Sequence, residues 1–322
     1  MTESVSALLP GLGPDAAREA LERQAAAYEL TCRDTAAGLE LELWGGVLRL
    51  AGARLLLQAP DMRTLFILQE AASYAFDAAG CVPVWDSVDE GAPAPNLSLF
   101  RVAGCRRISR DFRRLRVEGP DLARFALGGM HVRLVFALAG DPGWPRIDAR
   151  GRTHWPEGLH RPVYTIRRMD AAAGWADLDI FVHEGGRTTD WSATVAPGTE
   201  VGMIGPGGGE PLSGGWLGLF GDETALPAIA RMLEGADRAT TGIACLRAAP
   251  EDVAAIKAPP GVLLRVVPDL VAALRETGLP DGATVWFAAE KAEADAARAD
   301  LRTRGIARDR MQVAAYWTRD KG

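Results

Sequence analysis

Two glycines and two threonines, Gly185, Gly186, Thr188 and Thr189, form the segment with the clearest binding chemistry in this chain. They directly follow an apolar run that ends at His183. Glycine lets the backbone approach a ligand closely, and a threonine can cap a helix whose free N–H groups face an anion. The order of strand, glycines, threonines and helix-compatible residues therefore predicts a phosphate-binding turn.

A second candidate is a tyrosine followed by a threonine, Tyr164 and Thr165, in a short β-prone run. Strand alternation would place Val163, Thr165 and Arg167 on one side and Tyr164 and Ile166 on the other. A flavin needs an aromatic ring against its isoalloxazine and a hydroxyl near N5, the atom that receives hydride. The alternative is a Tyr-Thr pair in an ordinary strand. The phosphate-binding turn downstream favours the cofactor interpretation.

Two further turns, at residues 205–209 (GPGGG) and 221–224 (GDET), suit a second ligand. The GDET turn follows an apolar strand and opens a helix. Open parallel sheets bind ligands beyond the carboxyl ends of their strands, so this turn is well placed for a pyridine dinucleotide. It is not G-x-G-x-x-G, which counts against an ordinary dehydrogenase. Arg247 ends the second strand and would either meet a 2′-phosphate, favouring NADPH, or be a solvated strand end.

The elements that must position these residues fall into three parts. Residues 1–92 read as helix, strands, helix and a final strand, a small α+β domain. Residues 98–213 contain several short strands with Gly/Pro turns, which predict an antiparallel β-barrel. Residues 214–322 alternate between strand and helix, which requires a parallel sheet with helices on both faces. The segment 86–97 (DSVDEGAPAPNL) has the composition of a linker.

Composition excludes several classes of function. The net charge of -6 argues against nucleic acid as a partner. No apolar run approaches the roughly 20 residues of a membrane span, and the N-terminus does not resemble a signal peptide, so we expect a cytoplasmic protein. Neither the cysteines nor the histidines have metal-ligand spacing, so we expect no iron–sulfur cluster and no metal site. They are Cys32, Cys81, Cys105, Cys245, His131, His154, His160 and His183.

The tyrosine segment resembles a motif of the siderophore-interacting protein family. These are flavin-dependent ferric-siderophore reductases built on the ferredoxin-reductase plan. The family motif reads Arg-x-Tyr-Thr-x-Arg, and Tyr164, Thr165 and Arg167 match it. Pro162 stands in the place of the leading arginine, and Arg161 comes one residue early. A bulge in the strand would bring Arg161 into phase.

The glycine–threonine segment is similar to a second motif of the same family, Gly-Pro-Ala-Ser-x-Trp after an apolar strand ending in His. Gly186, Thr189 and Trp191 fit this pattern, while Arg187 and Thr188 replace Pro-Ala. The stretch GDETALPAI at 221–229 is the most specific match in the chain. The family also has a Glu after the fourth parallel strand and a Tyr-Trp-Arg near the C-terminus, which correspond here to Glu290 and to the stretch 316–319.

The resemblance implies two cofactor sites. For FAD it implies Arg161, Tyr164, Thr165, Ile166, Arg167, His183, Gly186, Thr188, Thr189 and Trp191. For NADH or NADPH it implies Gly205, Gly207, Gly221, Asp222, Glu223, Thr224, Arg247, Glu290 and Trp317.

The resemblance also implies a reaction: hydride passes from NAD(P)H to FAD, and electrons then pass singly to the Fe(III) of a siderophore. Hard oxygen donors hold Fe(III) better than Fe(II), so reduction releases the metal. No catalytic acid, base or nucleophile is then needed, because the flavin does the chemistry. The N-terminal part resembles the domain of unknown function 2218 family, and we interpret it either as a packing or partner-binding module or as a domain that helps to dock iron chelates.

Two alternatives remain at this stage: a flavin reductase for another acceptor, and an iron-chelate binding protein without reductase activity. Flavin absorbance that bleaches under NAD(P)H would exclude the second. The many arginines of the stretch 101–116 would either attract anionic siderophores or form a solvated strand face. The oligomeric state is left open.

Overall fold

The computed structural model describes residues 2–28, 30–212 and 214–319. The predicted boundary at 213 and the last residues of the range 214–322 lie outside them. The chain forms two compact units. The first comprises Met1–Ser98 and Ala137–His160, and the second comprises Leu99–Phe136 and Arg161–Gly322.

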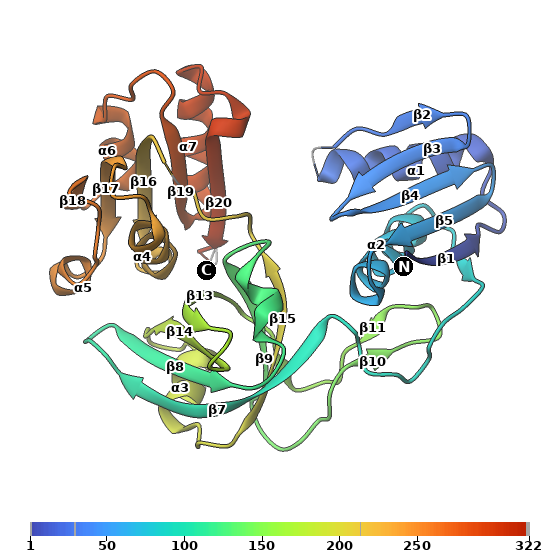
Figure 1. Cartoon of the computed structure of the whole chain (residues 1–322), viewed down its shortest axis with the longest axis horizontal. Helices are drawn as coiled ribbons and strands as arrows, with labels where there is room; N and C mark the ends of the chain where they lie inside the picture. Colours follow the sequence, from blue (N-terminus) through green and yellow to red (C-terminus); the bar gives the residue numbers. More distant parts are fainter. Residues whose placement is uncertain (1, 29, 213, 320–322) are drawn as a thin grey trace. The chain divides into compact units, whose positions relative to one another are not determined.

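The first unit contains a six-stranded antiparallel sheet and two helices (Figure 1). In the order β2-β3-β4-β5-β1-β6, the sheet buries alternate leucines such as Leu41, Leu48 and Leu57. Asp61 begins the second helix by accepting from the backbone N–H of Thr64 at 2.9 Å. The predicted small α+β architecture is observed. Its elements are β1 (Glu3–Leu8), α1 (Pro14–Ala27), β2 (Arg33–Thr35), β3 (Gly38–Leu43), β4 (Gly46–Ala51), β5 (Arg54–Ala59), α2 (Met62–Asp77) and β6 (Val84–Trp85).

The segment Ala137–His160 joins the first unit, although it lies within the range 98–213 assigned to the barrel from the sequence. It holds β10 (Arg146–Ile147), β11 (Thr153–His154) and β12 (Leu159–His160). The backbone N–H of Thr153 donates to Glu70 at 2.8 Å, and Ile147 packs against Phe66. Its turn-rich sequence lacks the strand alternation that would have revealed this packing.

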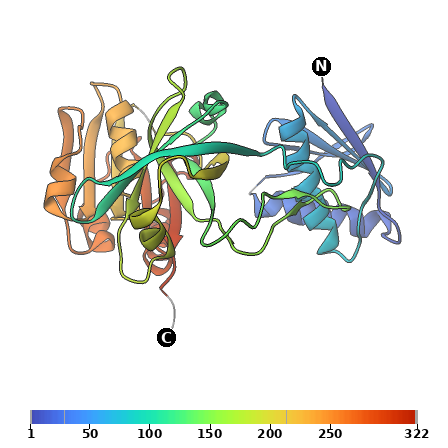
Figure 2. The same ribbon diagram turned by 90° about the horizontal axis from the view of Figure 1, so that it is seen from below.

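The second unit begins with a closed antiparallel barrel, coloured from green to yellow in Figure 2. The strand order is β9-β13-β14-β8-β7-β15, and the pairing of β15 with β9 closes it. Alternate residues such as Leu115, Leu134 and Leu178 fill the interior with no exposed surface. The predicted barrel is confirmed. Its elements are β7 (Leu97–Arg107), β8 (Phe112–Glu118), η1 (Leu122–Ala126), β9 (His131–Ala137), β13 (Val163–Asp170), β14 (Trp175–Phe181), α3 (Arg187–Thr194) and β15 (Glu200–Gly207).

A five-stranded parallel sheet of order β18-β17-β16-β19-β20 follows. Helices α4 and α5 contribute to one hydrophobic core and α6 and α7 to another, so helices cover both faces as predicted. The chain runs from β16 outward to β18 and then crosses to β19, which puts a topological switch point between β16 and β19. The elements are β16 (Trp216–Asp222), α4 (Leu226–Gly235), β17 (Thr241–Arg247), α5 (Pro250–Ala254), β18 (Gly261–Val266), α6 (Leu270–Glu276), β19 (Thr284–Glu290), α7 (Lys291–Thr303), η2 (Arg308–Arg310) and β20 (Met311–Trp317).

Helix α4 fixes the sheet against the barrel. Arg231 donates from Nη1 to the backbone carbonyl of Ile166 on β13 at 2.8 Å. Glu234, at the end of the same helix, pairs with Arg167 on that strand. Across the described residues, no helix is both long and apolar enough to span a membrane.

Candidate functional site

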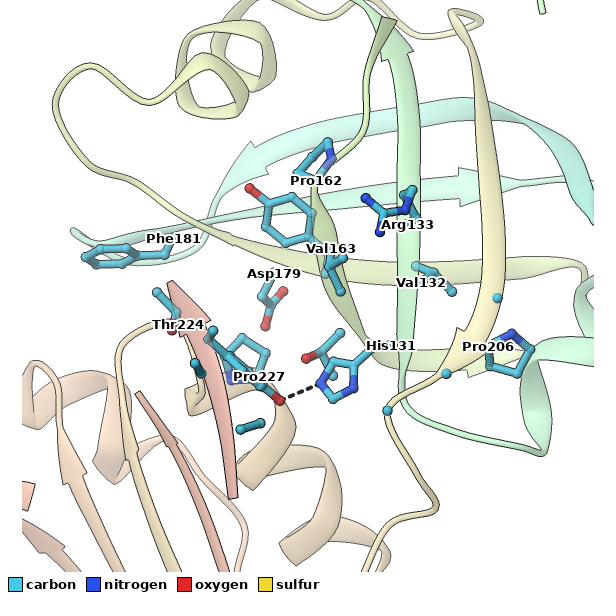
Figure 3. A pocket seen from close by; sticks show the side chains of 18 of the residues that line it. His131, Val132, Arg133, Pro162, Val163, Asp179, Phe181, Pro206, Thr224 and Pro227 are labelled. Atoms are coloured by element: carbon cyan, nitrogen blue, oxygen red, sulfur yellow. Dashed lines mark hydrogen bonds between the residues drawn. The ribbon is translucent and has the colours of Figure 1, made fainter. Parts of the chain in front are cut away.

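A pocket of about 720 Å³ lies in the second unit, between the barrel and the parallel sheet. This is within the usual size range of small-molecule sites. Barrel strands β9, β13, β14 and β15 form one wall, and the turn after β16 together with β20 forms the other. Figure 3 shows Phe181 and Asp179 from β14, His131 from β9 and Thr224 from the turn around this space.

Tyr164 links the two segments predicted to bind a flavin. It lines the pocket, and its phenol hydrogen-bonds the side chain of Thr188 in the first turn of α3. Burial raises the pKa of the Tyr164 phenol, so it is neutral near pH 7. The tyrosine segment and the glycine–threonine segment therefore lie side by side, as one binding site would require.

The start of α3 differs from the prediction that Thr188 or Thr189 caps it. The helix begins after Gly186, and no side chain among the described residues caps it. The hydroxyl of Thr189 instead accepts from the backbone N–H of His183 at 3.2 Å. A Cβ at position 186 would lie 2.7 Å from both the His183 Nε2 and the Thr189 Oγ1, so a larger residue would displace these side chains. First-turn N–H groups of a helix lack intrahelical partners, which makes this end suitable for an anion.

Trp191, in the middle of α3, packs against the barrel. Its ring stacks on Phe136 with centroids 4.0 Å apart. That contact anchors the helix to β9. The predicted FAD contact of Trp191 stays a prediction.

The residues after Tyr164 do not alternate simply. Thr165 is buried, pairs with His131 in register and lines the pocket. Ile166 is fully buried in the barrel core. A register shift follows between Ile166 and Arg168. On the other side of the motif, the backbone carbonyl of Arg161 accepts from Nη1 of the pocket residue Arg133 at 2.8 Å.

Arg167 already has a carboxylate partner. It is 5% exposed, and its Nη1 and Nη2 donate to Glu234 at 2.8 and 2.5 Å. Burial opposes ionisation of Glu234, but its bonds to Arg167 and Arg168 hold its pKa at about 2. A phosphate would therefore have to displace Glu234 to bind Arg167, and the predicted contact of Arg167 with the cofactor stays a prediction.

The turn at 221–224 is organised by a buried carboxylate. Asp222 is fully buried, and it accepts from the backbone N–H of Thr224 at 3.0 Å and from its hydroxyl at 2.6 Å. Its other oxygen accepts from Nε1 of Trp317 at 2.7 Å. A Cβ at Gly221 would lie 2.6 Å from that of Ala225, so glycine lets α4 approach β16. Burial raises the pKa of neighbouring Glu223. Asp222 therefore holds the turn in place, and Glu223 is a second carboxylate beside it.

The remaining predicted nucleotide residues also have partners within the protein. Arg247 forms a bidentate ion pair with Glu293 at 2.5 and 2.8 Å. Glu290 accepts from the backbone N–H groups of Ala292 and Arg319, at 2.6 and 3.2 Å. From β15, Gly205 and Gly207 line the pocket directly.

A pair that no sequence pattern indicated, His131 and Tyr316, lies across the pocket wall. The Tyr316 hydroxyl lies 2.5 Å from the His131 Nε2, a bond drawn as a dashed line in Figure 3. Burial and the nearby guanidinium of Arg231 lower the pKa of His131 to about 4. Burial also raises the pKa of Tyr316. The imidazole is therefore neutral near pH 7. The two residues are 185 positions apart, so no spacing rule would find them.

Asp179 and the arginines of β8 were also not recognised as partners. Asp179 lines the pocket and accepts from Arg114 at 2.6 and 2.7 Å. Arg116 makes the same kind of pair with Asp177, at 2.7 and 2.8 Å. Part of the predicted basic face is therefore neutralised within the barrel. Within residues 2–28, 30–212 and 214–319, no group of three or more His, Cys, Asp or Glu side chains is arranged to hold a metal ion.

Comparison with known proteins agrees with the division of the second unit. The family profile described as "Siderophore-interacting FAD-binding domain" matches residues 101–210. The profile described as "Siderophore-interacting protein" matches residues 215–320. The resemblance of the N-terminal part to the domain of unknown function 2218 family stays a prediction.

Among individual proteins, the chain is 30% identical over 237 residues to the ferric vibriobactin reductase ViuB of Vibrio cholerae, covering 66% of this chain and 86% of that protein. The siderophore-interacting protein SipS from Aeromonas hydrophila has a similar structure, with a TM-score of 0.59, 26% identity and coverage of 70% and 93%. A siderophore utilization protein from T. fusca gives a TM-score of 0.59 and 28% identity, with coverage of 73% and 97%. The chain belongs to the siderophore-interacting protein family.

Proposed function

We propose that this chain is an oxidoreductase that passes electrons from NAD(P)H through FAD to a ferric siderophore, releasing iron as Fe(II). The observation that carries the proposal is the pocket between the barrel and the parallel sheet. It brings Tyr164, which lies beside the first turn of α3, and Thr224 of the turn at 221–224 to one space. A cofactor and a nucleotide donor must meet in this way for electrons to pass between them.

The residues of the barrel fit a flavin. Tyr164 offers an aromatic ring and Thr165 a hydroxyl at the pocket wall. The start of α3 offers N–H groups beside Gly186, where a side chain would fill the space. These are the contacts that a planar ring and a diphosphate require. Bound FAD would supply the step from a two-electron donor to a one-electron acceptor.

The chain's own residues position and shield this chemistry. The hydrogen bond between Tyr164 and Thr188 holds the phenol against α3. Asp179 lines the pocket wall, and its ion pair with Arg114 balances its charge. The turn held by Asp222 places Thr224 at the opposite wall, where the donor would enter. Fe(III) arrives within its siderophore and is a substrate in this proposal.

The proposal draws support from relatives that act on iron chelates. ViuB is a ferric vibriobactin reductase. A second relative, the NADPH-dependent ferric-chelate reductase of Escherichia coli, is 29% identical over 148 residues, which is 43% of this chain and 55% of that protein. For the present chain, a ferric siderophore is therefore the acceptor that we propose.

The deciding experiment is an absorbance titration of the full chain with FAD, followed by anaerobic NADH or NADPH and then by a ferric siderophore with an Fe(II)-trapping dye. We expect FAD to bind, to bleach with the nucleotide and to recover its absorbance as Fe(II) appears. Tyr164→Leu should weaken FAD binding about tenfold, because the loss of an aromatic contact costs about 1 kcal/mol. Tyr28→Leu, at an exposed tyrosine of the first unit, is the matched control.

Each failure has a distinct meaning. Protein that cannot take up FAD would exclude the flavin mechanism. Reduced flavin that passes electrons to other acceptors but not to ferric siderophores would show a general flavin reductase.

A further inference from the structure

We propose that this chain uses NADH in preference to NADPH, and that Glu293 sets the preference by holding Arg247 away from a 2′-phosphate. This inference rests on the proposed function, because it concerns the nucleotide that donates the electrons. Glu293 then determines specificity, and Arg247 pairs with it instead of contacting a 2′-phosphate.

The pair lies where an open parallel sheet binds its nucleotide. Asp222 ends β16 and Arg247 ends β17, and the two are partners in register. Glu293 lies in the first turn of α7, immediately after β19. Because β16 lies between β17 and β19 in the sheet, the Arg247–Glu293 pair spans the carboxyl end of β16. That end borders the topological switch point, the crevice in which such sheets bind ligands.

The side chain of Arg247 is committed to this pair. Its two terminal nitrogens donate to the two oxygens of Glu293 at 2.5 and 2.8 Å. One of them also lies 3.8 Å from the buried carboxylate of Asp222. The side chain is 30% exposed and that of Glu293 is 23% exposed. The two-pronged face of the guanidinium is already occupied by Glu293, so a phosphate would have to compete with that carboxylate for bidentate binding.

The surrounding charges are unfavourable to a 2′-phosphate. Asp222, Glu223 and Glu293 face the single guanidinium of Arg247. Two more carboxylates, those of Glu251 and Asp252, begin the helix that follows β17. A phosphate monoester carries a charge of about −1.5 to −2 near pH 7, and like charges brought together weaken binding strongly. A ribose 2′-hydroxyl, in contrast, can donate to a carboxylate at this position, which is how such folds recognise NADH.

Arg319 is a further cation near this edge. Its guanidinium lies 5.8 Å from the ring centroid of Trp317, at the end of β20. Strand β20 is separated from β17 by β16 and β19. Even so, Trp317 donates to the same Asp222 oxygen that lies 3.8 Å from Arg247, so Arg319 is near the pair, and the Arg247→Gln variant below separates its contribution from that of Arg247.

Two measurements on the full chain test the inference. Calorimetry compares the binding of 5′-AMP with that of 2′,5′-ADP, which differ only by the 2′-phosphate and need no flavin. Anaerobic bleaching of bound FAD then gives kcat/KM for NADH and for NADPH. In the unmodified protein we expect 5′-AMP to bind at least roughly tenfold more tightly than 2′,5′-ADP. We expect kcat/KM for NADH to exceed that for NADPH by a similar factor.

Three variants locate the cause. Glu293→Gln should raise the use of NADPH relative to NADH by about tenfold, since it frees the fork of Arg247. Adding Arg247→Gln to that variant should abolish the gain. Asp295→Asn is the matched control: it removes one charge from the same helix, but that carboxylate pairs with Lys291 and Arg298. It should leave both ratios as they are.

The results separate this inference from the proposed function. A preference for 2′,5′-ADP or NADPH in the unmodified protein, or unchanged ratios in Glu293→Gln, would overturn the role of Glu293. So would an equal shift in Asp295→Asn, and so would a protein that binds neither adenine nucleotide. Tighter binding of 5′-AMP without any flavin reduction would leave the specificity standing and refute the proposed electron transfer.

Discussion

Replacing Tyr316 with phenylalanine tests how the C-terminal strand is held against the barrel. The change removes only the hydroxyl, which lies 2.5 Å from the His131 Nε2. The backbone of Gly207 hydrogen-bonds the same imidazole, so the ring orientation is fixed. Because His131 is neutral near pH 7, we assign the phenol as donor and Nε2 as acceptor. The variant leaves that acceptor without its partner.

The size of the effect follows from the burial of the pair. An unsatisfied buried polar group costs about 1–3 kcal/mol. Both side chains retain some exposure, so water can partly replace the hydroxyl, and we expect about 1–2 kcal/mol. For a unit of this size the melting temperature then falls by about 2–8 °C. Amide hydrogens of β20 should exchange roughly fivefold to thirtyfold faster, because the strand opens more often.

The assay is thermal unfolding together with hydrogen exchange resolved to single strands. Tyr164→Phe is the matched control, because it removes a phenol hydroxyl from the same pocket but breaks a bond to Thr188 on α3. It should speed exchange in α3 and leave β20 protected. If β20 exchanges at the same rate in Tyr316→Phe and in the unmodified protein, the reasoning about this bond is refuted.

Three further predictions concern charge and packing. The pKa of His131 is lowered from 6.5 to about 4 in the folded state, so its contribution to stability is complete above pH 6.5 and is lost as the pH falls toward 4. Relative to the His131→Gln variant, the free energy of urea unfolding should therefore fall by up to about 3 kcal/mol across that range. Parallel pH profiles of the two proteins would contradict this. The Gly186→Ala variant should bind FAD about tenfold or more weakly in an absorbance titration, because the new methyl group would lie 2.7 Å from the ring of His183. Unchanged affinity would show that this turn is not the phosphate site. Glu234→Gln should cost about 3 kcal/mol in urea unfolding at pH 7, since it leaves the guanidinium of Arg167 buried without its charge partner, and a loss below about 1 kcal/mol would show that this pair adds little.

The architecture was predictable because it follows from local patterns. Apolar runs alternating with helix-compatible segments require a parallel sheet, and β16 to β20 form one. Short strands with Gly/Pro turns indicated the barrel for the same reason. The adjacency of Tyr164 and α3 could also be expected, because an aromatic ring and a phosphate turn that serve one cofactor must lie within its length.

Predictions from local sequence patterns failed where a side chain bonds a residue that the pattern does not include. The sequence predicted Thr188 or Thr189 as the helix cap, but Gly186 holds that position, where a Cβ would contact the His183 ring and the Thr189 hydroxyl at 2.7 Å. The hydroxyl of Thr189 turns back to the His183 backbone instead. The segment Ala137–His160 packs in the first unit through bonds such as that of Thr153 with Glu70, which its turn-rich sequence does not indicate.

Ion pairs over long sequence separations account for the rest. An arginine at the end of a parallel strand looks the same in sequence whether it binds a phosphate or a carboxylate. The difference at Arg247 is made by Glu293, 46 positions later, which only the crossing from β18 to β19 brings to the same edge. Arg167 depends in the same way on Glu234, 67 positions away. Both arginines were predicted cofactor contacts, and both meet a carboxylate first. A phosphate must therefore compete with that carboxylate, and binding is weakened by the free energy of separating the pair. The nucleotide specificity of this site therefore depends on which carboxylates pair with its arginines, and the presence of an arginine alone does not determine it.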